Sequence, residues 1–299
     1  MADRIVSLLP SATEVLWFLG HGHRVVGVTF ECNEPPEASQ LPHVTDTIIP
    51  PGLQPAEIDQ VIRTAMEEKR ELYELDRGLL AKLDPDLIVS QDLCRVCALP
   101  AGDVDAAVRE LGCDAAVFSY DPMTLDQVFA EMAALDQLVG QESSAGTGTG
   151  TGTGAIERLQ QRLEAVSAKV GQRDRPDVLL LEWTDPPFTP GHWIPDLIEA
   201  AGGNPVLAHA GERSESTTWD VVAESHPDVL IVAPCGFDEA GAAAQLDDVV
   251  ARPELAELPA VRDGRTHAID ADGLIVRPGP RLVDGVEALA QILHPDCFA

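Results

Sequence analysis

The sequence predicts an α/β protein with two lobes, and three observations support this prediction. Short buried strands alternate with amphipathic helices along both halves of the 299-residue chain, a pattern typical of parallel sheets covered by helices. A long helical pattern and a Thr-Gly tract separate the two halves. A helix–turn–strand phrase also occurs once in each half, at residues 83–89 and 225–231. Because ligands of α/β sheets bind beyond the carboxyl ends of strands, we expect a ligand cleft between the lobes.

The first lobe is expected over residues 1–122. Its first helix is predicted to begin with a capping box from Ser11 to Glu14 and to end at Gly20. Pro55 at a first turn predicts the start of another helix. The strands of this lobe are predicted at residues 4–8, 24–28, 87–90 and 115–119, and its helices at 11–19, 55–69, 75–83 and 104–111.

A connecting helix is expected over residues 123–140, where apolar residues recur with helical spacing. Residues 141–154 contain four Thr-Gly pairs and predict a flexible surface insertion, because such a tract cannot pack a core. The second lobe is expected over residues 155–299. Its helices are predicted at 155–170, 193–201, 219–224 and 281–293, and its strands at 178–182, 229–233 and 266–269.

The charge of the chain excludes one class of function. The chain has fifty acidic and twenty basic residues, so its net charge is −30. Only three of the basic residues are lysines. Such a chain repels phosphate backbones, and we expect no nucleic-acid partner. The acids are spread along the whole sequence, which favours a hydrated surface suited to high salt, as in halophiles, over attraction of a ligand.

The chain contains no apolar run of the length that spans a bilayer, so we expect no membrane insertion. Its start also lacks the basic stretch, apolar core and cleavage site of an export signal. These observations predict a cytoplasmic protein, or an extracytoplasmic one if a signal segment has been removed.

Four cysteines follow predicted strands and could hold a metal: Cys32, Cys94, Cys97 and Cys235. The spacing Cys94-x-x-Cys97 is that of a ligand pair for zinc or an iron–sulfur cluster. The alternative is that these thiols are small side chains that pack loops.

Other candidate ligand-binding residues lie in the same strand-end loops. Trp183 and Trp193 could offer aromatic faces to a flat ligand or could simply pack in the core. His192 could contact a ligand or bond to backbone at a helix start. Arg277 and Arg281 flank a Pro-Gly-Pro turn and could bind an anion or pair with nearby acids.

Taken together, these loops resemble those of the substrate-binding proteins of ABC importers for cobalamin and iron–siderophores. The opening, Arg4-Ile5-Val6-Ser7-Leu8-Leu9-Pro10-Ser11-Ala12-Thr13-Glu14, resembles the start of that superfamily, and the resemblance covers residues 4–295 apart from the Thr-Gly insertion. The chain is most similar to a branch labelled cobalamin-binding proteins. That branch shares the segments Glu31-Cys32, 91–98, Glu182-Trp183, 191–193, 234–237 and 277–281.

The resemblance implies two Rossmann-like lobes joined by a single long backbone helix. It implies no catalysis, with cobalamin, another corrinoid or an iron chelate as the ligand and an ABC-transporter permease as a possible partner. It also implies the following ligand-binding residues: Pro10, Ser11, Glu31, Trp183, His192, Trp193, Phe237, Arg277 and Arg281. The alternative hypothesis is a cytoplasmic metalloprotein or enzyme that holds zinc or an iron–sulfur cluster on the four cysteines.

Overall fold

A computed structural model describes residues 2–92, 101–111, 114–140 and 151–298 of the chain. Its residues form two compact units, and each contains its own sheet. The first unit comprises the chain up to Pro122 together with Val128–Glu157, and the second comprises Met123–Gln127 and the residues from Arg158 onward. The predicted two-lobed α/β fold is confirmed.

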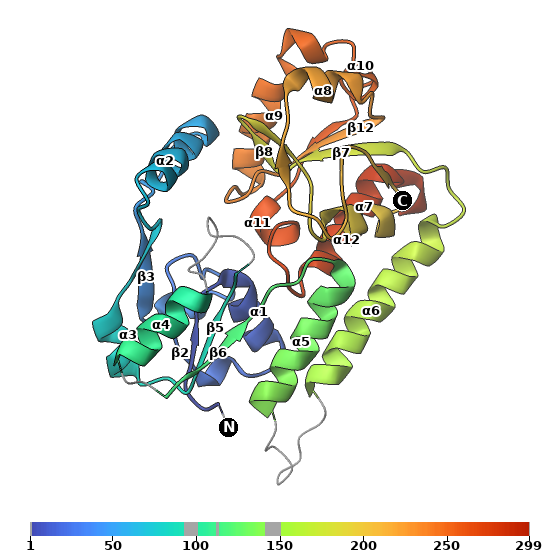
Figure 1. Ribbon diagram of the computed structural model, residues 1–299. Helices are drawn as coiled ribbons and strands as arrows, with labels where there is room; N and C mark the ends of the chain where they lie inside the picture. Colours follow the sequence, from blue (N-terminus) through green and yellow to red (C-terminus); the bar gives the residue numbers. More distant parts are fainter. Residues whose placement is uncertain (1, 93–100, 112–113, 141–150, 299) are drawn as a thin grey trace. The chain divides into compact units, whose positions relative to one another are not determined.

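The first unit is built on a six-stranded sheet with the order β4-β3-β2-β1-β5-β6. Figure 1 labels β2, β3, β5 and β6 of this sheet. All neighbours in this sheet run parallel except the edge pair β3 and β4. The strands are β1 (Ile5–Ser7), β2 (Val25–Thr29), β3 (His43–Thr47), β4 (Tyr73–Leu75), β5 (Leu87–Ser90) and β6 (Ala116–Ser119). The helices between them are α1 (Pro10–Phe18), α2 (Pro55–Glu67), α3 (Arg77–Leu83) and α4 (Ala101–Leu111).

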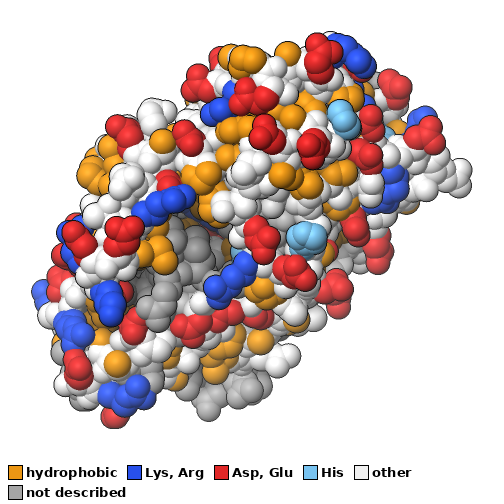
Figure 2. Space-filling model, turned by 45° about the horizontal axis from the view of Figure 1, so that its top comes forward, with side chains coloured by type: hydrophobic (Ala, Val, Ile, Leu, Met, Phe, Trp, Pro, Cys, Tyr) orange, Lys and Arg blue, Asp and Glu red, His pale blue; other side chains and the backbone are white. Residues whose placement is uncertain are grey.

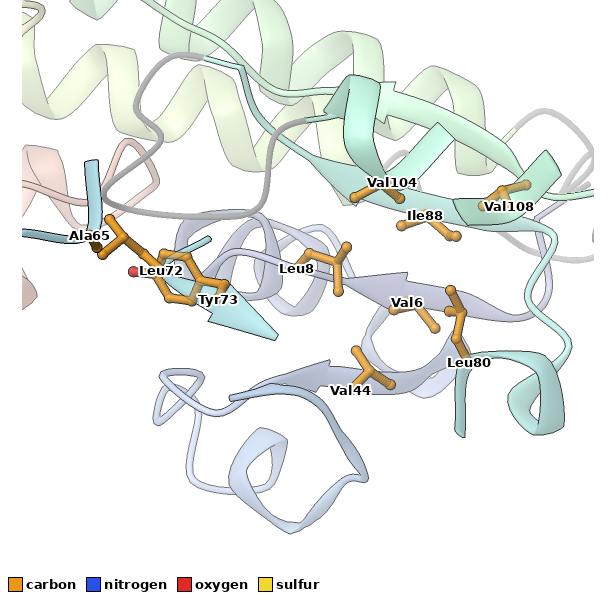
Figure 3. Packing of buried hydrophobic residues seen from close by; sticks show 10 residues of the cluster. All are labelled: Val6, Leu8, Val44, Ala65, Leu72, Tyr73, Leu80, Ile88, Val104 and Val108. Carbon is orange, nitrogen blue, oxygen red and sulfur yellow. The ribbon is translucent and has the colours of Figure 1, made fainter. Parts of the chain in front are cut away.

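Alternation along the strands sends one set of side chains to each face of this sheet. Val6 and Ile88 are fully buried and pack in one cluster with Leu80 of α3 and with Val104 of α4 (Figure 3). One part of the core of the first unit therefore lies between the sheet and the helices α3 and α4.

Two sequence predictions for the first unit are wrong. The predicted capping box does not form, because α1 already begins at Pro10, with Leu9 at the N-cap and no side-chain cap. Ser11 is therefore inside the helix. The strands β3 and β4 were not predicted, because β3 alternates polar residues and β4 has only three residues.

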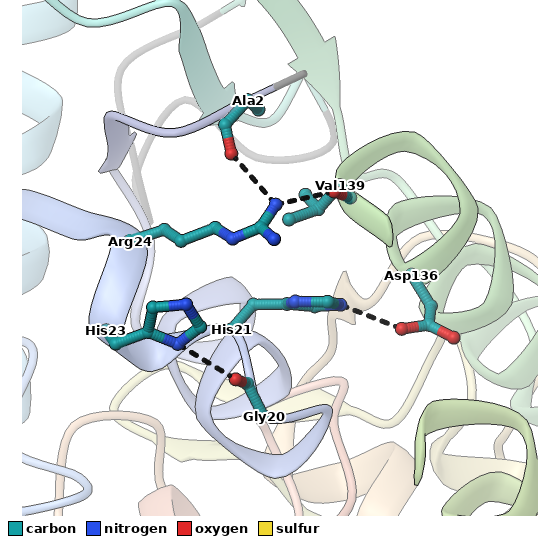
Figure 4. Close-up of polar contacts among 7 residues, drawn as sticks. All are labelled: Ala2, Gly20, His21, His23, Arg24, Asp136 and Val139. Atoms are coloured by element: carbon teal, nitrogen blue, oxygen red, sulfur yellow. Dashed lines mark hydrogen bonds and ion pairs between the residues drawn. The ribbon is translucent and has the colours of Figure 1, made fainter. Parts of the chain in front are cut away.

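Helix α5 (Leu125–Gly140) matches the predicted connecting helix, and its last turns are fixed by residues of the first unit. The Nη1 atom of Arg24 donates a 2.7 Å hydrogen bond to the carbonyl oxygen of Val139 (Figure 4). Nε2 of His21 lies 2.8 Å from Oδ1 of Asp136. Since the last carbonyls of a helix have no partner within it, the contact from Arg24 satisfies one of them and places a cation at the negative end of the helix dipole.

Helix α6 (Thr151–Val170) is longer than predicted. Residues 151–154, predicted to be part of the flexible insertion, form its first turn. A Cβ atom at Gly152 would collide with the carboxylate of Asp136, so glycine allows α6 to approach α5 closely. Both α5 and α6 contribute residues to both units, so the expectation of one backbone helix stays a prediction.

The second unit contains a four-stranded parallel sheet with the order β10-β7-β12-β13. The second unit also contains a small antiparallel sheet with the order β11-β9-β8. The strands are β7 (Asp177–Leu181), β8 (Trp183–Thr184), β9 (Pro187–Thr189), β10 (Asn204–Pro205), β11 (Glu215–Ser216), β12 (Val229–Val232) and β13 (Thr266–Ala268). The helices are α7 (Ile194–Ala200), α8 (Trp219–Glu224), α9 (Glu239–Val250), α10 (Pro259–Arg262), α11 (Ala271–Leu274) and α12 (Leu282–Leu293).

The strands β7 and β12 form the centre of the second core, and all eight of the residues 178–181 and 229–232 are fully buried. Leu179 and Leu230 pack in one cluster with Val222 of α8 and Val249 of α9. Helices α7 and α12 pack against each other. Near-continuous apolar strands are typical of a parallel sheet that is covered on both faces.

Acidic side chains are scattered over the face drawn in Figure 2 and do not gather in one patch. Within the described ranges, none of the helices combines the length and the apolar character that crossing a bilayer requires.

Candidate functional site

The loops at the carboxyl end of the second unit's sheet bring two predicted aromatic residues together. Trp183 follows β7, and Phe237 follows β12. Because these strands are parallel neighbours, both loops leave the same edge of the sheet. The rings of Trp183 and Phe237 meet edge to face, with their centroids 6.0 Å apart and an interplanar angle of 61°. Both side chains are half-buried, so part of their apolar surface faces outward.

A charged network lies beside this aromatic pair. Asp272 accepts hydrogen bonds from the backbone N–H of Gly236 at 2.9 Å and from Nη2 of Arg277 at 3.0 Å. Arg281 lies 3.9 Å from Asp270, which caps α11 through the N–H of Gly273. The structure therefore pairs both arginines with acids, which was one of the two alternatives. Arg277 is the more enclosed of the two, with 12% of its side chain exposed.

His192 and Trp193 lie in one loop but in different environments. Trp193 is buried, and its Nε1–H donates a 2.8 Å hydrogen bond to the carbonyl oxygen of Ile275. This contact gives Trp193 a packing role, which was one of the two alternatives, and its contact with a ligand stays a prediction. His192 is half-buried and adopts a left-handed backbone conformation with φ of 53°. Burial lowers the pKa of His192 below its usual 6.5, and the charge of Arg213 lowers it further.

In the first unit, the predicted residues lie around the end of β1. Pro10 starts α1 and is half-buried, whereas Ser11 is buried inside the helix. The hydroxyl of Thr13 donates to Ser7 at 2.8 Å and lies 3.0 Å from Sγ of Cys32. Cys32 is 1% exposed, so it belongs to a buried polar network under the loops. Glu31, one residue earlier, is half-buried.

A polar cluster at the end of β6 was not predicted from the sequence. The carboxylate of Asp121 accepts hydrogen bonds from the hydroxyl of Ser119 and from the N–H of Asp92, the latter at 2.7 Å. The N–H of Asp121 in turn donates to Oε2 of Glu131 on α5 at 2.7 Å. Burial raises the pKa of Glu131 from 4.5 to about 7, the hydrogen bond from Asp121 opposes this rise, and the charge of Asp121 adds to it. The adjacent Tyr120 is fully buried, which raises the pKa of its hydroxyl.

The raised pKa of Glu131 predicts a pH-dependent stability. The folded chain binds this proton more tightly than the unfolded chain, so the free energy of unfolding should fall as the pH rises from about 4.5 to about 7. Glu131→Gln keeps an oxygen acceptor for Asp121 but cannot ionise. We expect the variant to be more stable than the wild type at pH 8 and less sensitive to pH below 7 in urea unfolding. Glu67→Gln, at an exposed position of the same unit, should leave the wild-type pH profile unchanged; a Glu131→Gln profile parallel to the wild type would contradict the assignment.

The predicted metal site finds no support in the described part of the chain. Cys94 and Cys97 lie outside the described residues. Cys32 belongs to the first unit and Cys235 to the second, where it is exposed. In the ranges that the structure describes, no group of three or more His, Cys, Asp or Glu side chains could hold a metal ion.

Comparison with known families decides the kind of protein. The model of one family, described as "Periplasmic binding protein", matches residues 5–272. The chain belongs to this family. The resemblance noted in the sequence is thereby confirmed, and with it the class of two-lobed α/β binding proteins.

Relatives with similar sequences extend along almost the whole chain. A vitamin B12-binding protein of Vibrio cholerae is 25% identical over 98% of this chain and 89% of its own length. A cobalamin-binding protein of Halobacterium salinarum is 26% identical over 98% of this chain and 69% of its own. The uncharacterized ABC transporter substrate-binding lipoprotein YvrC of Bacillus subtilis is 23% identical over 99% of this chain and 81% of its own.

Solved structures share the fold. The periplasmic vitamin B12-binding protein BtuF of Vibrio cholerae superposes with a TM-score of 0.70 at 23% identity and covers 98% of this chain and 96% of its own. The periplasmic heme-binding protein RhuT of Roseiflexus sp. RS-1 superposes with a TM-score of 0.71 at 25% identity and covers 99% of this chain and 100% of its own.

These findings bear on three expectations. The relatives whose names state a function are binding proteins, in line with a binding role, and they give no support to the alternative of a cytoplasmic metalloenzyme. They also give no support to a cytoplasmic location, since the names of several include the words lipoprotein or periplasmic.

Proposed function

We propose that this protein is the substrate-binding component of an ABC importer and that it binds a corrinoid or a related metal chelate such as haem. The observation that carries the proposal is the half-buried pair of Trp183 and Phe237 at the carboxyl edge of the second unit's sheet. The relatives and structural neighbours named for a ligand include vitamin B12-binding, cobalamin-binding and haem-binding proteins.

The chemistry of this edge suits a large flat ligand. The aromatic faces would cover the apolar plane of a macrocycle, and apolar burial supplies most of the affinity in such sites. The backbone of the 235–237 loop is fixed to Asp272, and Asp272 is fixed to Arg277. These contacts hold the loop that carries Phe237 in place before the ligand arrives, which reduces the entropy lost on binding.

The role implies a second partner and a location. The protein would carry its ligand outside the cytoplasmic membrane and present it to the permease of the importer. The expectation that the ligand lies between the two lobes stays a prediction, as do the roles of Pro10, Ser11 and Glu31.

Replacing Trp183 with alanine should weaken ligand binding. We expect cobalamin or haem, added to the purified protein and followed by calorimetry, to bind about 10- to 30-fold more weakly, because a central aromatic contact contributes about 1.4–2 kcal/mol. Trp219→Ala is the matched control. Trp219 is also half-buried in the second unit, but its ring lies 4.2 Å from the guanidinium of Arg252 and packs against the core cluster around Leu179 and Leu230.

The two variants make the outcome decisive. If the wild type binds cobalamin and haem with micromolar or better affinity and only Trp183→Ala loses it, the proposal holds. If the wild type binds neither corrinoid, haem nor ferric siderophore, the proposed function is wrong. If both variants bind as tightly as the wild type, the ligand does not contact this edge.

A further inference from the structure

The backbone around His192 is held by an unusual pairing of two loops. Its N–H donates a 2.6 Å hydrogen bond to the carbonyl oxygen of Glu212, and its carbonyl oxygen accepts one of 3.0 Å from Gly211. The loops approach so closely that a Cβ atom at Gly191 would collide with the backbone of Ser214 and lie 2.6 Å from the oxygen of Glu212. This pairing fixes His192 in the left-handed region, at φ of 53°. A non-glycine residue is uncommon there, and such outliers concentrate at functional sites.

The two imidazole nitrogens of His192 differ in their hydrogen-bonding partners. Nδ1 lies 3.4 Å from the hydroxyl oxygen of Ser214, which is a long hydrogen bond. No described residue hydrogen-bonds to Nε2. Burial and the charge of Arg213 lower the pKa of His192, so the ring is neutral at pH 7. A proton on Nδ1, directed to the hydroxyl oxygen of Ser214, would leave the lone pair on Nε2, which is the tautomer of a metal-ligating histidine.

His192 is linked through direct contacts to the aromatic edge described above. Its ring centroid lies 5.6 Å from that of Trp193, and Trp193 is anchored to the carbonyl oxygen of Ile275. Arg277 follows Ile275 by two residues and donates a hydrogen bond to Asp272. Asp272 in turn accepts one from the N–H of Gly236, in the loop that carries Phe237. These contacts within the second unit connect the loop of His192 to the loop that carries Phe237.

We propose that Nε2 of His192 coordinates the metal of the bound ligand, an inference that rests on the function proposed above. The ligand class is then a planar metal tetrapyrrole with an exchangeable axial position, such as an aquo-corrinoid or ferric haem. Binding breaks the bond between the metal and its axial water, the water leaves, and the imidazole lone pair forms a new bond to the metal. The oxidation state of the metal does not change, and no proton is transferred.

Coordination by His192 would distinguish two ligands that share the same macrocycle, aquocobalamin and cyanocobalamin. In aquocobalamin a water molecule on the cobalt can be replaced, whereas in cyanocobalamin a cyanide holds that position. We expect the wild type to shift the visible absorption bands of aquocobalamin or ferric haem on binding, and to bind cyanocobalamin without such a shift. The band shift reports coordination directly and does not depend on transport.

The variant His192→Asn tests the proposal without changing the backbone, because asparagine tolerates the left-handed conformation. We expect it to abolish the band shift and to weaken binding of the aquo form at least about tenfold, with less than about a twofold change for cyanocobalamin. Ser214→Ala removes the partner of Nδ1 and should weaken binding of the aquo form about tenfold while leaving the band shift in place. His209→Asn is the control, since His209 is exposed in the neighbouring loop.

Each outcome decides the inference. A band shift that is lost in His192→Asn and kept in His209→Asn supports it. Tight binding of aquocobalamin and haem with no band shift, or with a shift that survives in His192→Asn, overturns it and leaves the proposed function intact. Failure of the wild type to bind any tetrapyrrole overturns both.

Discussion

Replacing Gly191 with alanine is expected to destabilise the second unit by about 1–3 kcal/mol and to weaken ligand binding, because the new methyl group has no room. The atoms that it meets are backbone atoms, including the carbonyl carbon of Arg213 and the carbonyl oxygen of Glu212, both 2.6 Å away. A flexible side chain could turn aside, but these atoms can move only if the paired loops separate. Separation would break the two hydrogen bonds that hold the backbone of His192.

Urea unfolding followed by tryptophan fluorescence suits this measurement, because Trp183, Trp193 and Trp219 all belong to the second unit. Gly102→Ala is the control. Nothing lies within 4 Å of a Cβ atom at that helical position, so alanine should be neutral or stabilise by up to about 1 kcal/mol. An unfolding curve of Gly191→Ala that matches the wild type would show that the loops are not packed as described.

Replacing Ile88 with alanine should destabilise the first unit by about 2–5 kcal/mol. Ile88 lies on a central strand, is fully buried and packs with Val6 and Val104. Removal of three carbon atoms loses their transfer free energy and leaves a cavity that the sheet cannot fill.

Far-UV circular dichroism should then show the first unit unfolding at lower urea than the second. Met66→Ala is the control, since 65% of Met66 is exposed, and it should change stability by less than about 0.5 kcal/mol. If Ile88→Ala and Met66→Ala unfold alike, Ile88 does not contribute to the core as we describe.

Elements with a strong periodic pattern could be predicted from the sequence, and weakly patterned ones could not. The buried strands β5, β7 and β12 and the helices α5 and α12 lie within a few residues of their predicted bounds. Helix α9 was missed because its Ala-rich sequence, EAGAAAQLDDVV, has little contrast between its faces. The strands β8, β9 and β11 were missed because segments of two or three residues carry no periodicity, and β11 also pairs with β9 from a distant part of the chain.

The same distinction holds for the site. The rule that ligands bind at strand ends directed attention to the loops after β7 and β12, where Trp183 and Phe237 lie, and the roles of these residues stay predictions. It could not identify the residues that fix these loops, because Asp272 of α11 reaches the N–H of Gly236 from a distant part of the chain, and Ser214 likewise reaches His192 only in the folded backbone. Trp193 was assigned to the ligand because its aromatic ring is visible in the sequence, whereas its burial is not.

The first unit is discontinuous along the chain, because it needs the segment Val128–Glu157 in addition to the residues up to Pro122. During synthesis the sheet strands of this unit therefore leave the ribosome well before the helices that complete it. At about 5–20 residues per second, the wait for those last residues lasts a few seconds. In that interval the apolar surface that α5 covers in the finished unit is open to chaperones and to other nascent chains. Just over half of the polypeptide, 157 of 299 residues, must emerge before even one unit can be complete.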